Sequence, residues 1–256
     1  YQEFDDFNKR WSAAVGGSIA DIIATGIGEG RRIVFVGDSI TQQQAWGAMC
    51  DLLRHGYKVF DVENGKEMAA CDNCSEHYET AFGFRARKWD AQTKSLSGPT
   101  STIRYLKLNR YSPRDTKLYL NEDTAALFVN WGMWYPNNDD APSSECAGGS
   151  RCSFAQLLRQ HLRDFLPKLA RWTKSGGMAV FREVTPQHFA SQDGAYHGQY
   201  APDSPEHGCK PLAAEKMLNS STKAGWNTAW QWKILQDTML DLGISNSSTD
   251  CGSGIY

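Results

Sequence analysis

The sequence of 256 residues contains no uninterrupted run of about 18 apolar residues, the length that a membrane-spanning helix needs. It also contains no internal repeat, no low-complexity tract and no long run of like charge. Lysine and arginine number 27 against 29 aspartate and glutamate residues, so the formal net charge is −2 and gives no electrostatic reason to expect nucleic-acid binding. A hydrophobic content of 41% with 22% charged residues is typical of a globular chain with a substantial core.

The seven cysteines form no complete metal-binding or redox pattern. Cys71 and Cys74 make one CxxC with His77 nearby, but no second CxxC or histidine pair completes a zinc pattern, and a metal site there remains only an alternative. A thioredoxin-type role is disfavoured because this CxxC lies in polar loop sequence. We therefore expect no metal and no cofactor. Six cysteines in predicted loops are instead disulfide candidates of an oxidising compartment: Cys71, Cys74, Cys146, Cys152, Cys209 and Cys251.

Glycosylation sequons favour the same compartment. Three N-x-S/T sequons begin at Asn73, Asn219 and Asn246. The sequence begins at Tyr1 without a methionine or a signal peptide, as expected of a processed or partial chain. Because seven is an odd number, one thiol is free, pairs between chains, or pairs outside the given sequence. We expect a protein of the secretory pathway, in the Golgi lumen, at the cell surface or outside the cell.

Hydrophobic patterns predict alternating strands and helices. The continuous β-branched run Ile33–Val36, bounded by Gly37, is typical of a strand buried on both faces of a parallel sheet. Further predicted strands cover 102–108, 125–130 and 178–182, and predicted helices cover 41–55, 153–173 and 226–242, with a helical lead-in within 1–30. We expect one domain over 1–256, a three-layer α/β/α sandwich with a mainly parallel sheet and loop-rich, disulfide-bearing insertions at 62–101 and 136–151.

The first predicted strand ends in Gly37-Asp38-Ser39 directly before a helix. Ligands of α/β sheets bind beyond the carboxyl ends of the strands, where helix N-termini present free N–H groups. Ser39 is therefore placed to attack an acyl group with its hydroxyl while its own N–H stabilises the oxyanion. The alternative is that Asp38 or Ser39 merely caps the helix.

Three segments, in the same order, resemble the SGNH/GDSL hydrolases. They are FVGDSITQQQ at 35–44, LFVNWGMWY at 127–135 and FREVTPQHF at 181–189. The first resembles block I of that superfamily, and the second and third are similar to the N-x-G-x-W-W and FRT-x-SPRHF segments of its PC-esterase branch. That branch includes the trichome-birefringence-like polysaccharide O-acetyltransferases and related algal and animal proteins. The resemblance spans about 31–242 and implies an SGNH-hydrolase-like fold.

The resemblance also implies roles for individual residues. Ser39 matches the nucleophile, Asn130 the side chain that donates to the oxyanion, and Asp38 a motif residue that orients the turn; a strand-end turn is the alternative role for Asn130. Substrate-binding candidates are Arg182, whose fork suits carboxylates and hydroxyls, His188, which could equally be a packing residue, and the aromatic residues Trp131, Trp134 and Tyr135, for which a place in the core is the alternative.

The sequence departs from the family pattern at the catalytic base. The family takes its histidine and aspartate from a C-terminal D-x-x-H motif, whereas here Asp250-Cys251-Gly252 is followed by Ser253. We expect that the given sequence stops before the true motif. Two alternatives stay open: the base has been lost, or His188, His197 or His207 replaces it.

These features favour a serine-dependent carbohydrate O-acyl transferase or esterase, most simply for acetyl groups, acting on a polysaccharide or a glycoprotein glycan. The alternative is an inactive extracellular glycoprotein on the same fold that binds glycans or joins an extracellular protein assembly. The residues named for the transferase and for the esterase are the same, so the sequence does not separate the two reactions.

Overall fold

A computed structural model describes residues 19–24, 29–68, 81–131, 135, 140–181 and 229–244. These residues belong to two compact units, which are described separately. The first unit takes in the described residues up to 109 together with 114–130 and 171–181, and the second takes in 110–113, 131–170 and 229–244. The expectation of a single domain over 1–256 stays a prediction.

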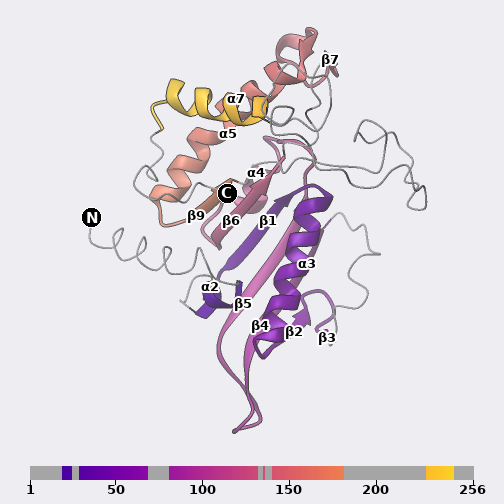
Figure 1. Cartoon of the computed structure of the whole chain (residues 1–256), viewed down its shortest axis with the longest axis vertical. Helices are drawn as coiled ribbons and strands as arrows, with labels where there is room; N and C mark the ends of the chain where they lie inside the picture. Colours follow the sequence, from indigo (N-terminus) through magenta and orange to yellow (C-terminus); the bar gives the residue numbers. More distant parts are fainter. Residues whose placement is uncertain are drawn as a thin grey trace, which may run out of the picture. The chain divides into compact units, whose positions relative to one another are not determined.

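The first unit is built on a mixed seven-stranded sheet with the order β3-β2-β4-β5-β1-β6-β9 (Figure 1). Strands β5, β1, β6 and β9 run parallel to one another, whereas the neighbouring strands β3, β2, β4 and β5 are paired antiparallel. The strands are β1 (Arg32–Gly37), β2 (Tyr57–Asp61), β3 (Glu67–Met68), β4 (Ala81–Asp90), β5 (Ser95–Lys107), β6 (Thr124–Asn130) and β9 (Met178–Phe181). This sheet, packed against helices, confirms the predicted α/β fold class.

Continuous apolar sequence explains the centre of the sheet. Strands β1 and β6 are buried along almost their whole length, because each is flanked by two parallel neighbours and covered on its faces. Their register pairs Val34 with Leu127 and Gly37 with Asn130. The last residues of the two strands therefore lie side by side at the carboxyl edge of the sheet.

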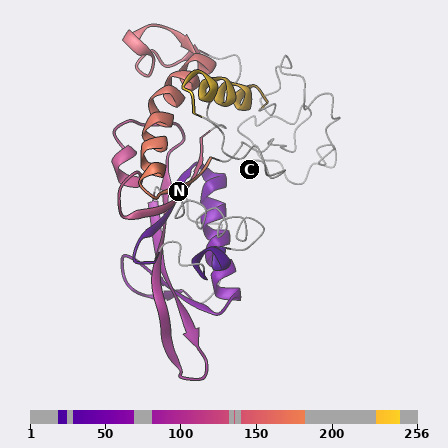
Figure 2. The ribbon, with the colours of Figure 1, turned by 90° about the vertical axis from the view of Figure 1, so that its left-hand side faces the viewer.

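Helix α3 (Ser39–Arg54) covers one face of this sheet, as Figures 1 and 2 show. Its buried residues include Ala45, Met49 and Leu52, which recur at helical spacing and pack on β1, β5 and β2. Trp46 stacks on Phe82 of β4 with ring centroids 4.2 Å apart. The short helix α2 (Ile19–Ala24) packs against α3 and belongs to the predicted helical lead-in.

The expectation of a loop-rich insertion over 62–101 is wrong for three strands, the short β3 and two longer ones. Residues 81–90 form β4 and residues 95–101 form the first half of β5. In β4, Phe82, Phe84 and Ala86 face the core while charged residues alternate with them. Such alternation is typical of an antiparallel strand with one solvent face, and it lacks the continuous apolar run that marks a parallel strand.

The second unit contains two long helices and a small disulfide-closed loop. Helix α5 (Phe154–Lys174) begins in this unit, and its residues from Arg171 onward belong to the first unit. The other elements of the second unit are helix α7 (Ala229–Asp241), strands β7 (Asp140–Ala141) and β8 (Cys152–Ser153), and the 3-10 turn η2 (Ala147–Gly149). The first unit also contains a short helix, α4 (Thr116–Tyr119). A disulfide joins Cys146 to Cys152, two of the predicted cysteines, across a Cα–Cα distance of 5.9 Å. Among the described helices, none has the length and apolar character to cross a bilayer.

Candidate active site

The turn between β1 and α3 places Ser39 at the first position of a sixteen-residue helix. Asp38 is the N-cap residue, and its Oδ1 accepts hydrogen bonds from the backbone N–H groups of Ile40 at 3.0 Å and Thr41 at 3.5 Å. The cap therefore uses the second and third amides of the helix and does not use the N–H of Ser39. Ser39 itself is partly exposed, while Asp38 is 0% exposed.

A buried tyrosine holds this turn from the neighbouring strand. The hydroxyl of Tyr105 donates toward the carbonyl oxygens of Gly37 and Asp38, at 3.3 and 3.1 Å. Gly37 has no room for a side chain, since a Cβ there would collide with Thr41 Oγ1 and the carbonyl oxygen of Asn130. The tight approach of β1, β6 and the first turn of α3 therefore depends on this glycine.

Asn130 lies at the carboxyl end of β6, in register with Gly37 of β1. It is 2% exposed, and its Oδ1 has no hydrogen-bond partner among the described residues. Ser39 follows Gly37 by two residues, so the structure brings Ser39, just after β1, and Asn130, at the end of the adjacent strand β6, to the same edge of the sheet. This is the juxtaposition that the sequence motifs predict, and it is also where ligands of α/β sheets bind.

Buried polar atoms without partners gather around this edge. They are Asp38 Oδ2, Thr41 Oγ1 and Asn130 Oδ1, none of which is hydrogen-bonded within the part of the chain that the structure describes. Leaving a buried polar group without a partner costs about 1–3 kcal/mol, so a native fold retains such groups for a specific reason. A binding site supplies such a reason, because a bound ligand or water molecule would hydrogen-bond these atoms.

Burial sets the protonation of the two ionisable groups at the turn. Burial raises the pKa of Asp38 above its ordinary value, although hydrogen bonds from the backbone of Ile40 and Thr41 oppose the shift. Burial, together with the nearby charge of Asp38, raises the pKa of Tyr105. Tyr105 therefore stays neutral and keeps its proton for the two carbonyl groups of the turn.

No base contacts the serine within the described residues. Ser39 Oγ makes no hydrogen bond there, and no histidine or carboxylate is bonded to it. In the same part of the chain, no group of three or more histidine, cysteine, aspartate or glutamate residues is arranged to hold a metal ion. The structure thus places Ser39 and Asn130 at one edge of the sheet, with no base bonded to Ser39 among the described residues.

Two of the aromatic residues considered for sugar stacking lie in the core. Trp131 is 1% exposed and packs against Phe165 and Tyr111, with ring centroids 4.6 and 5.2 Å apart. Tyr135 is fully buried, and its hydroxyl lies 2.7 Å from Nδ1 of His161. The structure therefore places Trp131 and Tyr135 in the core, which is the alternative that the sequence left open for these aromatic residues.

Several predicted residues lie outside the described part of the chain. They are the substrate-binding candidates Trp134, Arg182 and His188, the sequon residues Asn73, Asn219 and Asn246, and the disulfide candidates Cys71, Cys74, Cys209 and Cys251.

Three residues that the structure makes relevant were not predicted from the sequence. Tyr105 and Thr41 contribute to the site, but neither carries a signal of its own, since tyrosine is common in strands and threonine is common near helix starts. Cys50 is disulfide-bonded although it was not among the candidates. Its position in the last turns of a predicted helix concealed it, because the disulfide candidates were confined to loops.

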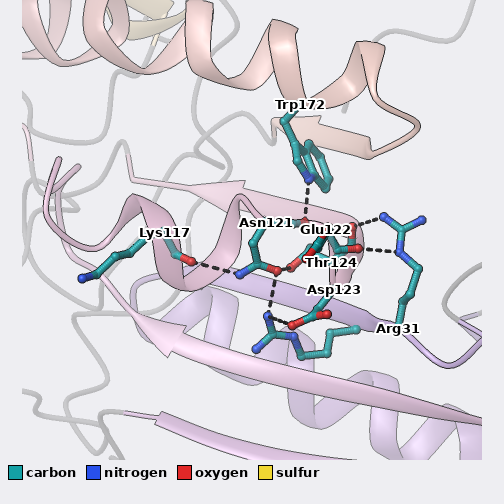
Figure 3. A network of polar contacts seen from close by, with 8 residues as sticks. Arg31, Lys117, Asn121, Glu122, Asp123, Thr124 and Trp172 are labelled. Atoms are coloured by element: carbon teal, nitrogen blue, oxygen red, sulfur yellow. Dashed lines mark hydrogen bonds and ion pairs between the residues drawn. The ribbon is translucent and has the colours of Figure 1, made fainter.

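The opposite, amino end of β1 and β6 carries a dense polar network (Figure 3). Asn121 Oδ1 accepts from Arg32 Nη2 at 2.8 Å and from Thr124 Oγ1 at 3.3 Å, and Asn121 Nδ2 donates to the carbonyl of Lys117 at 2.9 Å. Trp172 Nε1 donates to the carbonyl of Asn121 at 3.0 Å. Arg31 donates to the carbonyls of residues 122 and 124 at 2.9 and 2.6 Å.

Comparisons with known proteins find no matching family model, no matching curated protein and no matching solved structure. Any assignment of function therefore rests on the residues and their geometry.

Proposed function

We propose that the chain is a serine-dependent carbohydrate O-acyl transferase or esterase, with acetyl as the acyl group, acting on a polysaccharide or a glycoprotein glycan. The observation that carries the proposal is the turn at the end of β1. There Ser39 opens α3 with a backbone N–H that the Asp38 cap leaves free, beside Asn130 at the end of the adjacent strand.

The proposed reaction uses each of these groups in turn. Ser39 Oγ attacks the acyl carbonyl carbon while a base removes its proton, and the carbonyl oxygen becomes an oxyanion. The N–H of Ser39 and the side-chain amide of Asn130 donate to that oxyanion; the amide suits this role because it donates without titrating. Collapse of the tetrahedral intermediate expels the first alcohol and leaves an acyl-serine. Attack by a sugar hydroxyl completes transfer, whereas attack by water completes hydrolysis.

The helix start supports this chemistry electrostatically. The N–H of Ser39, which the Asp38 cap does not use, and the dipole at the N-terminus of α3 favour developing negative charge beside Ser39. Asp38 does not act as the base in this proposal, because its Oδ1 is engaged with the backbone of the first turn. Its role is to hold the turn together with Tyr105.

The carbohydrate part of the proposal is supported by the three ordered segments that resemble the PC-esterase branch. No described residue is bonded to Ser39 as a base, so the proposal takes the base from elsewhere in the protein. A D-x-x-H segment of the kind found in that branch would supply it, as would a histidine at 188, 197 or 207.

The test is acetate release from an acetylated xylan by the native chain with its disulfides intact. We expect Ser39→Ala to lower the rate by at least about 10³-fold, since removal of the nucleophile leaves only binding and oxyanion stabilisation. Ser97→Ala, on the β4–β5 hairpin, is the matched control and should keep the native rate. Equal rates for native protein and Ser39→Ala would overturn the proposal.

A second candidate is favoured by one observation, the lack of a base bonded to Ser39 among the described residues. On this account the chain binds glycans without transforming them. Binding of the xylan with a native rate no higher than that of Ser39→Ala would support it.

A further inference from the structure

The antiparallel half of the sheet has a cationic outer face on the side away from α3. Side chains alternate between the faces of a strand, and Val59, Phe84 and Ile103 belong to the core beneath α3. Their neighbours along β2, β4 and β5 therefore lie on the other face. We define the basic face by these residues: Lys58, Phe60, Arg85, Arg87, Trp89, Thr102 and Arg104.

The register brings like charges together on this face. Lys58 is paired directly with Arg87, and Arg85 lies diagonally from Arg104 because Arg85 pairs with Thr102 while Gly83 pairs with Arg104. Like charges that face each other across a sheet destabilise it. The only acidic side chain that bonds to this face among the described residues is Glu67, which pairs with Lys58 at 2.9 Å.

Arg85 and Arg104 are exposed and make no hydrogen bond or ion pair within the described residues. Gly83 leaves space for the stem of Arg104, whose Cγ would lie 3.2 Å from a Cβ at that position. The guanidinium of Arg104 is thus carried on a stem packed against the strand. Two such forks on neighbouring strands suit carboxylate or sulfate groups, which they bind bidentately.

Aromatic rings flank the arginines. Trp89 lies beneath Lys58, whose Nζ is 4.5 Å from the ring centroid, and Phe60 is paired with Arg85. Strands β4 and β5 extend as a two-stranded ribbon beyond their neighbours (Figure 1), which gives this face an elongated form. Repeated anionic groups along a chain fit an elongated basic surface better than a single small anion does.

We propose that the basic face binds a glycan that bears carboxylate or sulfate groups. The choice of a glycan over other anionic polymers rests on the proposed function. The face would hold the anionic polymer, and Ser39 would act on its acyl groups. The cationic charge is local, since the chain as a whole has a net charge of −2.

The test is titration of the full, disulfide-intact chain with oligogalacturonate, with neutral dextran as the uncharged comparison and polyglutamate as an acidic polypeptide. We expect Arg85→Gln/Arg104→Gln to weaken oligogalacturonate binding by at least about tenfold, since each arginine loses charged hydrogen bonds. Arg85→Lys/Arg104→Lys should recover part of the affinity, because it keeps the charge but loses the fork. The control Arg159→Gln/Arg171→Gln makes the same change in charge on exposed residues of α5 and should bind as the native chain does.

Unchanged affinity in Arg85→Gln/Arg104→Gln, with an unaltered melting temperature, would overturn the inference. Polyglutamate that binds as tightly, and with the same dependence on the two arginines, would also overturn it in favour of an acidic polypeptide. Ser39→Ala should bind oligogalacturonate as the native chain does. Arginine-dependent binding by a chain whose Ser39 is inert would therefore refute the proposed function and leave the binding surface standing.

Discussion

The two ends of the strand pair β1–β6 differ in how they treat their polar groups. At the amino end, both side-chain heteroatoms of Asn121 are hydrogen-bonded to neighbours, and its carbonyl accepts from Trp172. At the carboxyl end, no described residue bonds to Oδ1 of the buried Asn130, or to Asp38 Oδ2 and Thr41 Oγ1 beside it. Asparagine thus completes a hydrogen-bond network at the amino end, whereas at the carboxyl end its Oδ1 has no partner among the described residues.

This difference distinguishes the amino end, whose polar groups stabilise the fold, from the carboxyl end, which we propose to be functional. Hydrogen bonds between polar groups at the amino end hold β1, β6 and the end of α5 in place. Among the described residues, Arg32 Nε is a buried atom of this network without a partner. Open polar groups at the carboxyl end cost stability in the absence of a ligand, and such a cost is typical of functional sites. Substitutions at the two ends should therefore act on different quantities.

Among substitutions that compare the two ends, Asn130→Ala should have the largest effect, and that effect is on catalysis. Loss of one oxyanion donor typically lowers a rate by about 10²–10³-fold. Because Asn130 Oδ1 has no partner to lose among the described residues, we expect the free energy of unfolding to change by less than about 1 kcal/mol. The measurements are acetate release and urea unfolding. A normal rate in this variant would remove Asn130 from the site.

Asn121→Ala is the matched substitution at the other end and should reverse the pattern. It removes three side-chain hydrogen bonds, to Arg32, Thr124 and Lys117. We expect a loss of about 1–3 kcal/mol in the free energy of unfolding, with the rate per folded molecule unchanged. Urea unfolding and acetate release under strongly native conditions check both parts, and a specific loss of rate would contradict the division of roles.

The smallest expected effect is the pH dependence of Asp38→Asn. Burial raises the pKa of Asp38 in the folded chain, so the folded state binds its proton more tightly than the unfolded state does. Ionised Asp38 is therefore a cost above the folded pKa, and that cost disappears as the pH falls below the ordinary value of 3.8. Because asparagine also caps helices, we expect Asp38→Asn to be slightly more stable than the native chain at pH 7, with the difference closing in acid.

Unfolding of the native chain and of Asp38→Asn at matched pH values isolates this residue from all other carboxylates. A stability difference that widened toward low pH would show that ionised Asp38 stabilises the fold, contrary to its burial with no partner for Oδ2 among the described residues.

Sequence patterns predicted the parallel half of the fold well and the antiparallel half poorly. The apolar runs of β1 and β6 are almost continuous, as expected of strands buried on both faces, and α3 and α5 have clear helical periodicity. Strand β4 has one core face and one charged face, so its arginines and lysine resembled loop sequence. The hairpin pairing that orders it is a tertiary effect that local hydrophobicity does not record.

The sequence predicted those residues of the candidate site that belong to its motifs. Gly37-Asp38-Ser39 at a strand end and Asn130 at the next strand end are local signals, and the register between β1 and β6 joins them. Tyr105 reaches the turn from 67 residues away, at a distance no local pattern encodes. Trp131 follows Asn130 directly, yet its side chain is buried against Phe165, which shows why adjacency to a site residue does not assign a ligand contact.

The most direct test of the central claim is to identify the residue that a serine-reactive fluorophosphonate modifies in the native, disulfide-intact chain. Peptide mapping by mass spectrometry should find the adduct on Ser39, with labelling retained in Asn121→Ala and abolished in Ser39→Ala. A folded chain that carried no adduct on Ser39, or carried it equally on other serines, would contradict the assignment of the carboxyl edge of β1 and β6 as an active site.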